Sequence, residues 1–129
     1  MTETCPFCEG RTDSDQLSFN DLAYTRLDNF PISPGHLLII PKRHAADWFD
    51  LSPAEQQAVM ALIEEGKSWL EAHHRPHGYN IGMNCGKAAG QTVMHMHCHL
   101  IPRYEGDRED PRGGVRWVMP EKADYWSEQ

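Results

Sequence analysis

The 129-residue chain is poor in basic residues, in cysteine and in long apolar runs. Its 12 lysines and arginines stand against 19 aspartates and glutamates, and the net charge of −7 argues against general affinity for nucleic acid or acidic membranes. The longest aliphatic run extends only from Leu37 to Ile40, far short of the ~20 residues that span a bilayer. The start of the chain shows no basic, apolar leader. We therefore expect a soluble, cytoplasmic protein that binds any anionic substrate through local groups.

The four cysteines limit the chemistry further. Without an export signal, reduced thiols are expected rather than disulfides. Cys5 and Cys8 form a C-x-x-C pair, a spacing that can bind metal. Cys98 alternates with histidines and is expected to pack inside a strand, whereas Cys85 has no partner spacing. The length and the 40% content of hydrophobic residues predict one domain with an ordinary core.

The most informative segment is 95–101, in which His95, His97 and His99 alternate with apolar residues. In a strand, residues two apart point to the same face about 6.5 Å from each other, so this pattern predicts a row of three imidazoles. Such a row suits a phosphate chain, because neutral imidazole is a nucleophile near pH 7 and protonated imidazole is a donor and a cation. Alternating histidines also bind zinc well. The spacing alone leaves metal binding and catalysis equally open.

The rest of the pattern predicts an α+β domain with a mainly antiparallel sheet. Ser52, Pro53 and Glu55 form a strong helix start, with a capping serine, a proline in the first turn and a capping box. The expected elements are strands over 22–27, 36–40, 79–84 and 95–101 and a helix from Ser52 to about Ala72. The small-residue loop 86–92 can bring backbone N–H groups close to an anion.

Taken together, these motifs resemble the histidine triad (HIT) superfamily of nucleotide hydrolases and transferases. Segment 95–101 fits the family signature His-φ-His-φ-His-φ-φ, and segments 90–93, 34–36 and 40–42 match the motifs around it. The resemblance implies the HIT fold, a five-stranded mainly antiparallel sheet with one long helix, usually in a homodimer. It divides the chain into a HIT domain, residues 1–104, and a C-terminal extension, residues 105–129, packed on the same domain or on its dimer partner.

The resemblance also implies catalytic roles for three histidines. His97 matches the nucleophile, which would form a nucleotidyl-imidazole intermediate that water then hydrolyses. Splitting one hard displacement into two easier ones makes chemical sense. His99 matches a phosphate-contacting catalytic histidine, and His36 matches a histidine that supports the site. Because the nucleophile attacks as a free base from one nitrogen, its other N–H needs an acceptor, and we expect a main-chain carbonyl of the same strand.

Four further residues match substrate-binding positions of the family. Asp28 matches a ribose-binding carboxylate, and Asn84 falls near the leaving group. Gln91 and Thr92 match the phosphate-contacting loop. For Asp28 and Asn84, turn capping is the alternative role.

The N-terminal C-x-x-C motif resembles the zinc-bearing bacterial branch of the superfamily. The implied ligands are Cys5, Cys8, His44 and His95, a tetrahedral Cys₂His₂ set that would hold a structural zinc. No organic cofactor is expected.

The favoured function is hydrolysis at a nucleotide α-phosphate, because segment 102–107 resembles the dinucleoside polyphosphate hydrolases. Diadenosine tetraphosphate represents the expected substrates. Nucleoside phosphoramidate hydrolysis and dinucleoside polyphosphate phosphorolysis are alternatives that use the same residues, and a zinc-stapled nucleotide-binding module with little turnover is the rival of another class. The arginines of segment 111–117 could reach a polyphosphate, or the extension could be a solvated tail anchored by Trp117.

Overall fold

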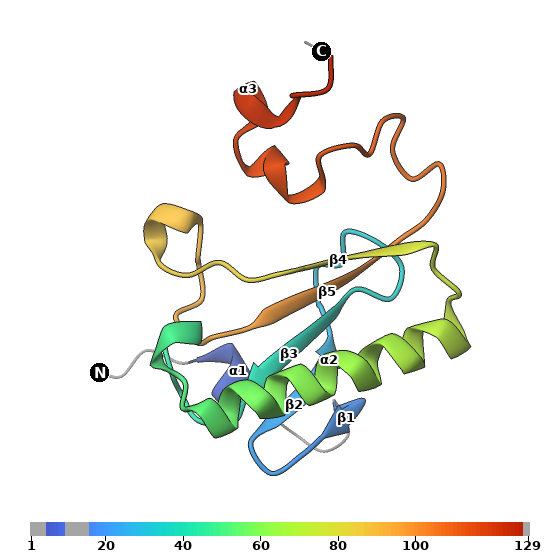
Figure 1. The fold of residues 1–129 in the computed structure, drawn as a ribbon. Coiled ribbons are helices and arrows are strands. Elements are labelled where there is room, and N and C mark those ends of the chain that lie inside the picture. The colour runs from blue at the N-terminus through green and yellow to red at the C-terminus, as the bar shows by residue number, and fades with distance from the viewer. Residues whose placement is uncertain (1–4, 10–15, 128–129) are drawn as a thin grey trace.

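The computed structural model describes residues 5–9 and 16–127 (Figure 1). Residues 1–4 of the predicted HIT domain, residues 10–15 and residues 128–129 lie outside the described residues. The helices are α1 (Pro6–Glu9), α2 (Pro53–His73) and α3 (Pro120–Ala123), and the 3-10 helices are η2 (Trp48–Asp50), η3 (Lys87–Ala89) and η4 (Gly114–Val118). The strands are β1 (Ser18–Phe19), β2 (Ala23–Leu27), β3 (Leu37–Pro41), β4 (Gly78–Gly82) and β5 (Cys98–Arg103).

The five strands form one sheet in the order β1-β2-β3-β5-β4, and every neighbouring pair is antiparallel. The predicted α+β class with a five-stranded antiparallel sheet is therefore confirmed. β3 is buried along its whole length at the centre of the sheet, as its aliphatic run predicts. Its pairing with β5 sets Leu38 opposite His99, so the register places a histidine of the motif next to the core.

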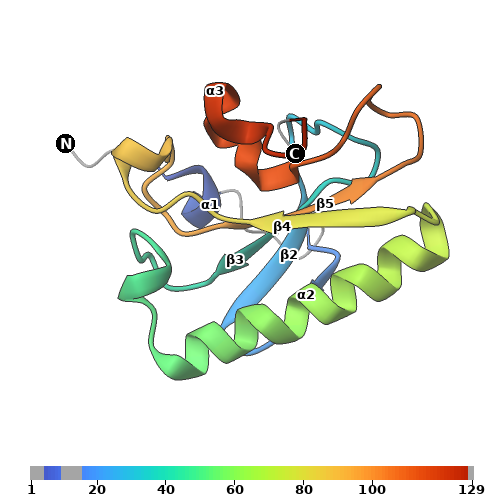
Figure 2. The ribbon, with the colours of Figure 1, turned by 45° about the horizontal axis from the view of Figure 1, so that its top comes forward.

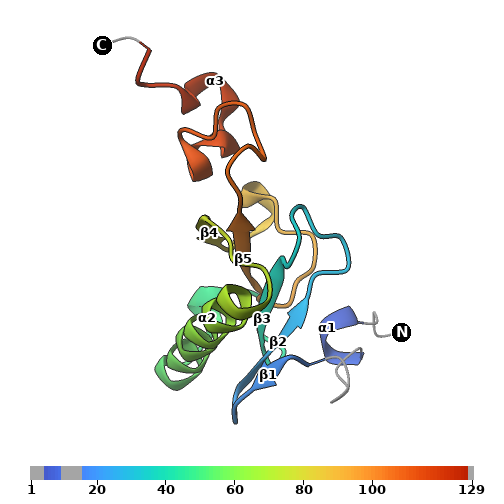
Figure 3. The same ribbon diagram turned by 90° about the vertical axis from the view of Figure 1, so that its right-hand side faces the viewer.

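The long helix α2 begins as the sequence predicts. The Ser52 hydroxyl accepts from the Glu55 N–H, and the Glu55 carboxylate accepts from the Ser52 N–H, which completes the capping box. The helix covers one face of the sheet, and Leu37 and Leu100 pack beneath it in the main core (Figures 1 and 3). None of the helices in the described parts of the chain is both long and apolar enough to span a membrane.

On the opposite face of the sheet, a smaller core lies over β2 and β3. Leu38 and Ile40 point to this side and form a smaller core with Phe7 of α1 and Tyr24 of β2. In Figure 3, α1 and α2 lie on opposite sides of the sheet. The remaining part of this face, over β4 and β5, is where the histidines lie.

The histidine strand is shorter than predicted. β5 begins at Cys98 rather than at His95, because the Met96 N–H donates to the Ala45 carbonyl of a loop instead of to a neighbouring strand. His95 and His97 therefore precede the strand, and their side chains need not follow its alternation between the two faces of the sheet. β4 likewise ends at Gly82, short of the predicted Asn84, and β1 is too short for its periodicity to be seen in the sequence.

The C-terminal extension lies beyond the β4 edge of the sheet (Figures 1 and 2). η4 packs on β4, and Gly114 approaches so closely that an added Cβ would lie 3.2 Å from the Asn80 side-chain nitrogen. Arg112 and Arg116 stack on Trp126 and Tyr125 of the extension itself. Within this chain, these two arginines serve to pack the extension.

A single glycine fixes the turn before β3. Gly35 has φ +90°, and an added Cβ would lie 2.7 Å from Leu70 Cδ2 of α2. We expect Gly35→Ala to lower the free energy of unfolding by about 2–4 kcal/mol, through the positive φ and the overlap with Leu70. Urea denaturation measures this loss. Gly82→Ala is the matched control, since Gly82 has open space around its Cα and no such φ, and a comparable loss in both variants would contradict the argument.

Candidate active site and candidate metal centre

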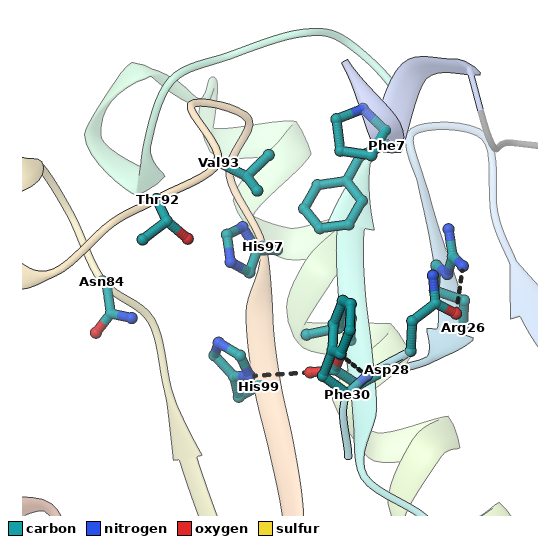
Figure 4. Close-up of a pocket in the computed structure, with 12 residues that line it drawn as sticks. Phe7, Arg26, Asp28, Phe30, Asn84, Thr92, Val93, His97 and His99 are labelled. Atoms are coloured by element: carbon teal, nitrogen blue, oxygen red, sulfur yellow. Dashed lines mark hydrogen bonds and ion pairs between the residues drawn. The ribbon is translucent and has the colours of Figure 1, made fainter. Parts of the chain in front are cut away.

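A pocket of about 390 Å³ opens on the sheet face opposite α2. It collects five of the predicted site residues from four separate segments: Asp28, Asn84, Thr92, His97 and His99. Figure 4 shows the two histidines on the β5 segment, between Asn84 on one side and Asp28 on the other. The volume falls within the range of about 300–1,000 Å³ that is typical of small-molecule sites.

The His97 ring is held in the tautomer that a nucleophile requires. Its Nδ1–H donates to the His95 carbonyl over 2.8 Å, and a carbonyl can only accept. Nε2 therefore keeps its lone pair, and the ring lines the pocket. The expected main-chain acceptor is confirmed, although it lies just before the strand rather than within it.

His36 and His99 form a directed hydrogen-bond chain. The Ile32 N–H donates to His36 Nδ1 over 3.2 Å, so in the neutral ring the proton lies on Nε2. This Nε2–H donates to His99 Nδ1 over 2.9 Å. His99 therefore carries its own proton on Nε2. His36 is buried and lines no part of this pocket, and its contact with the pocket is the hydrogen bond to His99.

Both rings of this chain are neutral at pH 7. Burial lowers the pKa of His99 to about 4, with further lowering from the neighbouring His97 and His36. Burial also lowers the pKa of His36, outweighing the opposite effect of Asp28. His99 therefore offers a phosphate a neutral N–H donor rather than a full positive charge.

Asp28 combines the capping role and the site role that its sequence position left open. Its Oδ1 accepts from the Phe30 N–H over 2.9 Å, which caps the turn. Its Oδ2 lies 3.4 Å from His36 Nε2 and 4.0 Å from His99 Nδ1, at the wall of the pocket (Figure 4). The carboxylate is thus in place for a substrate hydroxyl beside the histidines.

Gln91 differs from the other predicted binding residues. Its side chain is 5% exposed and lines no part of the pocket that holds Thr92. The amide donates to the carbonyls of Ala46 and Val93 and accepts from the Gly86 N–H. These bonds occupy the amide and brace the small-residue loop, so the structure places Gln91 behind the loop rather than on its phosphate-facing side.

The second cluster joins the four predicted metal ligands. Sγ of Cys8 lies 3.3 Å from His44 Nδ1 and 3.4 Å from His95 Nδ1, and Sγ of Cys5 lies 3.3 Å from the same His95 atom. The two histidine Nδ1 atoms are 3.2 Å apart. Ligands bound tetrahedrally to zinc at about 2.0–2.3 Å lie about 3.3–3.8 Å from one another, so this donor set fits zinc.

The tautomer of His95 also fits a metal ligand. Its Nε2–H donates to the Pro41 carbonyl over 2.8 Å, which leaves the Nδ1 lone pair facing the cysteines. Among the described residues, Asp28, His36 and His99 form the other group of possible ligands, but His36 offers no free nitrogen lone pair to a metal there. There His36 Nδ1 is occupied by the Ile32 N–H, and its Nε2 carries a proton. These hydrogen bonds favour a proton network at Asp28, His36 and His99, and a metal at the Cys₂His₂ cluster.

The residues between the two cysteines form part of the pocket that His97 and His99 line. Pro6 and Phe7 line it, and the Phe7 ring lies 5.0 Å from the His97 ring, centroid to centroid. Phe30, which is 84% exposed, flanks the pocket across from Phe7 (Figure 4). No sequence pattern predicts a site role for either aromatic residue. Their positions could have indicated a site role, because Phe7 lies inside the C-x-x-C motif and Phe30 follows Asp28 by two residues.

The neutral histidine chain predicts a pH dependence of stability. The unfolded chain protonates His99 near its ordinary pKa of 6.5, whereas the folded chain does so only near pH 4, so stability falls as the pH drops from about 6.5 to about 4. We expect this loss to be about 1–3 kcal/mol and to be smaller in His99→Asn. Urea denaturation at pH 7 and pH 5 compares the two proteins.

The carboxylate of Glu55 titrates below this window. The Arg43 guanidinium lowers the pKa of Glu55 to about 2, so the contribution of that carboxylate is lost only as the pH falls below about 4.5. The same loss between pH 7 and pH 5 in wild type and His99→Asn would contradict the assigned charge state.

Comparisons with known proteins agree with this geometry. A family model described as HIT domain matches residues 9–106. An uncharacterized HIT-like protein of Mycoplasma genitalium is 39% identical over 107 residues, which cover 81% of this chain and 76% of the relative. An AP-4-A phosphorylase of Mycobacterium tuberculosis is 37% identical over 87 residues, which cover 67% of this chain but only 45% of that enzyme.

A solved structure of similar fold contains bound zinc. The crystal structure of a zinc-bound histidine triad family protein from Mycobacterium smegmatis is similar to this chain, with a TM-score of 0.73 and 32% sequence identity. The match covers 83% of this chain and 80% of that chain.

Proposed function

The chain belongs to the HIT domain family, and we propose that it cleaves nucleotides at the α-phosphate, with dinucleoside polyphosphates such as diadenosine tetraphosphate as substrates. One observation carries this proposal. The Nδ1–H of His97 is bound to the His95 carbonyl, which leaves the Nε2 lone pair available to the pocket. A ring held in this way is a nucleophile ready for phosphorus.

The reaction follows from this tautomer. His97 Nε2 attacks the α-phosphorus, a phosphorus–nitrogen bond forms, and the bond to the bridging oxygen breaks with its electron pair going to the leaving phosphate. The ring becomes cationic because Nδ1 keeps its proton, and the His95 carbonyl stabilises that charge. Water then attacks the same phosphorus, loses a proton to solvent and releases the nucleotide and the neutral ring.

The neighbouring residues bind and orient the substrate in this proposal. Asp28 accepts from the ribose hydroxyls, and Asn84 and Thr92 meet the phosphates at the opposite wall. His99 donates its Nε2–H to a phosphate oxygen, and His36 fixes the tautomer of His99. Gln91 contributes by holding the loop that presents Thr92.

We propose further that Cys5, Cys8, His44 and His95 hold a structural zinc. Four protein donors leave no open coordination position, so such an ion stabilises the fold and takes no part in the reaction. A homodimer in the cytoplasm, as the family resemblance implies, completes the proposal.

Phosphorolysis is the second candidate, because the Mycobacterium tuberculosis relative is named a phosphorylase. In that reaction inorganic phosphate replaces water as the acceptor. Among the described residues that line the pocket, Arg26 is the only lysine or arginine, and its guanidinium also donates to Asn29. A pocket with so little positive charge favours water over a second anion as the acceptor.

The products of diadenosine tetraphosphate decide between the candidates. We expect AMP and ATP, with or without added inorganic phosphate, whereas phosphorolysis would give ADP and ATP only when phosphate is present. An adenosine phosphoramidate, assayed in parallel, tests the remaining alternative. Nucleotide binding without release of product from either substrate would contradict the enzymatic proposal and favour the binding module.

A further inference from the structure

A second groove, distinct from the nucleotide pocket, lies over β4 and β5 on the same face of the sheet. Its volume is about 460 Å³. It shares Asp28, Phe30, Asn84 and His99 with the nucleotide pocket, so the two cavities meet at His99. No residue of this groove beyond the shared group and His36 has a role in the proposed reaction.

The groove has the lining of a site for an uncharged, apolar group. Seven of the thirteen residues that line it have apolar side chains: Phe30, Ile32, Ile81, Met83, Ile101, Val115 and Val118. No lysine or arginine lines it within the part of the chain that the structure describes, and the two histidines it contains are neutral at pH 7. Phosphate groups would find no counter-charge there, whereas a nucleobase would bury its flat apolar surface and reach the Asn84 amide.

The C-terminal extension forms one wall of this groove. Val115 and Val118 of η4 line it, and they are 63% and 79% exposed. Gly114 of η4 lies close to Asn80 of β4, so η4 packs directly against this strand. The extension therefore has a structural place in the site, through its valines rather than through its arginines.

From these observations we infer that the groove binds the second nucleoside of a dinucleoside polyphosphate, the one that departs with the leaving phosphates. This inference rests on the proposed function and adds to it the part of the substrate that the catalytic histidines do not contact. The first nucleoside occupies the pocket beside Phe7, the phosphates cross at His97 and His99, and the second nucleoside lies against Val115 and Val118.

Diadenosine triphosphate and ATP provide a matched pair of substrates. Attack at the α-phosphorus releases ADP from the first and pyrophosphate from the second, so their leaving groups differ by one adenosine. We expect wild type to prefer diadenosine triphosphate in kcat/KM, and Val118→Asp to reduce this preference about tenfold. A new carboxylate repels the more highly charged ATP more strongly, so charge repulsion alone would raise the preference.

Two further variants control this comparison. Met119→Asp places the same charge on the neighbouring residue, which does not line the groove, and should keep the wild-type preference. Val118→Ala removes apolar surface without adding charge and should reduce the preference less than Val118→Asp does. Equal preferences in wild type and Val118→Asp would overturn the inference. A change in the sedimentation coefficient of Val118→Asp would also overturn the inference, because that change would show that this face contacts another copy of the chain.

A binding measurement separates this inference from the proposed reaction. Calorimetry on His97→Ala compares the affinities of diadenosine triphosphate and ATP without turnover. If diadenosine triphosphate binds more tightly than ATP, and if Val118→Asp abolishes this difference, the result supports the groove. This holds even if wild type cleaves neither compound, because absence of cleavage would refute only the proposed reaction. Equal affinities would overturn the groove whatever the activity.

Discussion

Replacing His97 with alanine is expected to reduce kcat for diadenosine tetraphosphate by at least about 10³-fold. The variant loses the only ring whose free nitrogen is set by the His95 carbonyl, and the neutral His99 cannot substitute, because its Nδ1 accepts from His36. Binding residues such as Asp28 remain in place, so KM should change far less than kcat. Steady-state kinetics with quantified AMP release gives both constants.

The controls for this variant address fold and specificity. His73→Ala removes an exposed histidine that stacks on Trp69 far along α2, and it should keep full activity. Circular dichroism and urea denaturation show whether His97→Ala stays folded. A folded His97→Ala with activity within about tenfold of wild type would refute the nucleophile.

Loss of one cysteine ligand should produce the largest change in stability. Cys8 faces both His44 and His95, so Cys8→Ser removes a donor from the centre of the cluster. We expect wild type to carry one zinc per chain and Cys8→Ser to carry almost none. The free energy of unfolding should fall by at least about 3 kcal/mol, which lowers Tm by about 10–20 °C in a chain of this size.

Cys85→Ser is the matched control for the metal. Cys85 is partly buried and belongs to no ligand group among the described residues, so this variant should keep both the zinc and the stability of wild type. Elemental analysis and thermal denaturation of the three proteins test the prediction together. Wild type purified without zinc under metal-replete conditions would contradict it.

The geometry also predicts whether thermal stability or turnover is lost first when zinc is removed. Zinc would hold His95, whose carbonyl orients His97, and it would hold the loop that carries Phe7. Zinc is not the only support of this region, because the Met96 N–H donates to the Ala45 carbonyl and the Tyr24 hydroxyl donates to the Phe7 carbonyl. A partly chelated sample should therefore show reduced thermal stability first. Complete loss of turnover in protein that is still folded would contradict a purely structural metal.

The sequence predicts the elements of this fold well where local chemistry determines them. The start of α2 follows from Ser52, Pro53 and Glu55, which lie within four residues of one another, and the buried β3 follows from its aliphatic run. The start of β5 does not follow in the same way. Its alternation extends back to His95, but the bond from Met96 to Ala45 depends on a loop fifty residues away, which no local pattern reveals.

The same distinction applies to the site. The three histidines look equivalent in sequence, yet His95 faces two cysteines while His97 and His99 face the nucleotide pocket. Only the family resemblance predicted this division, because it arises from the meeting of segments far apart in the chain. The contribution of Val115 and Val118 depends likewise on how η4 docks on β4, and sequence pattern gives no sign of it.

The stereochemical course at phosphorus tests the central claim most directly. Attack by His97 and then by water makes two in-line displacements, and each inverts the α-phosphorus. Hydrolysis of a substrate with a chiral α-phosphorothioate in ¹⁸O-labelled water should therefore give a nucleotide with retained configuration. Inversion would mean that water attacks the substrate directly, and it would contradict a covalent nucleotidyl-His97 intermediate.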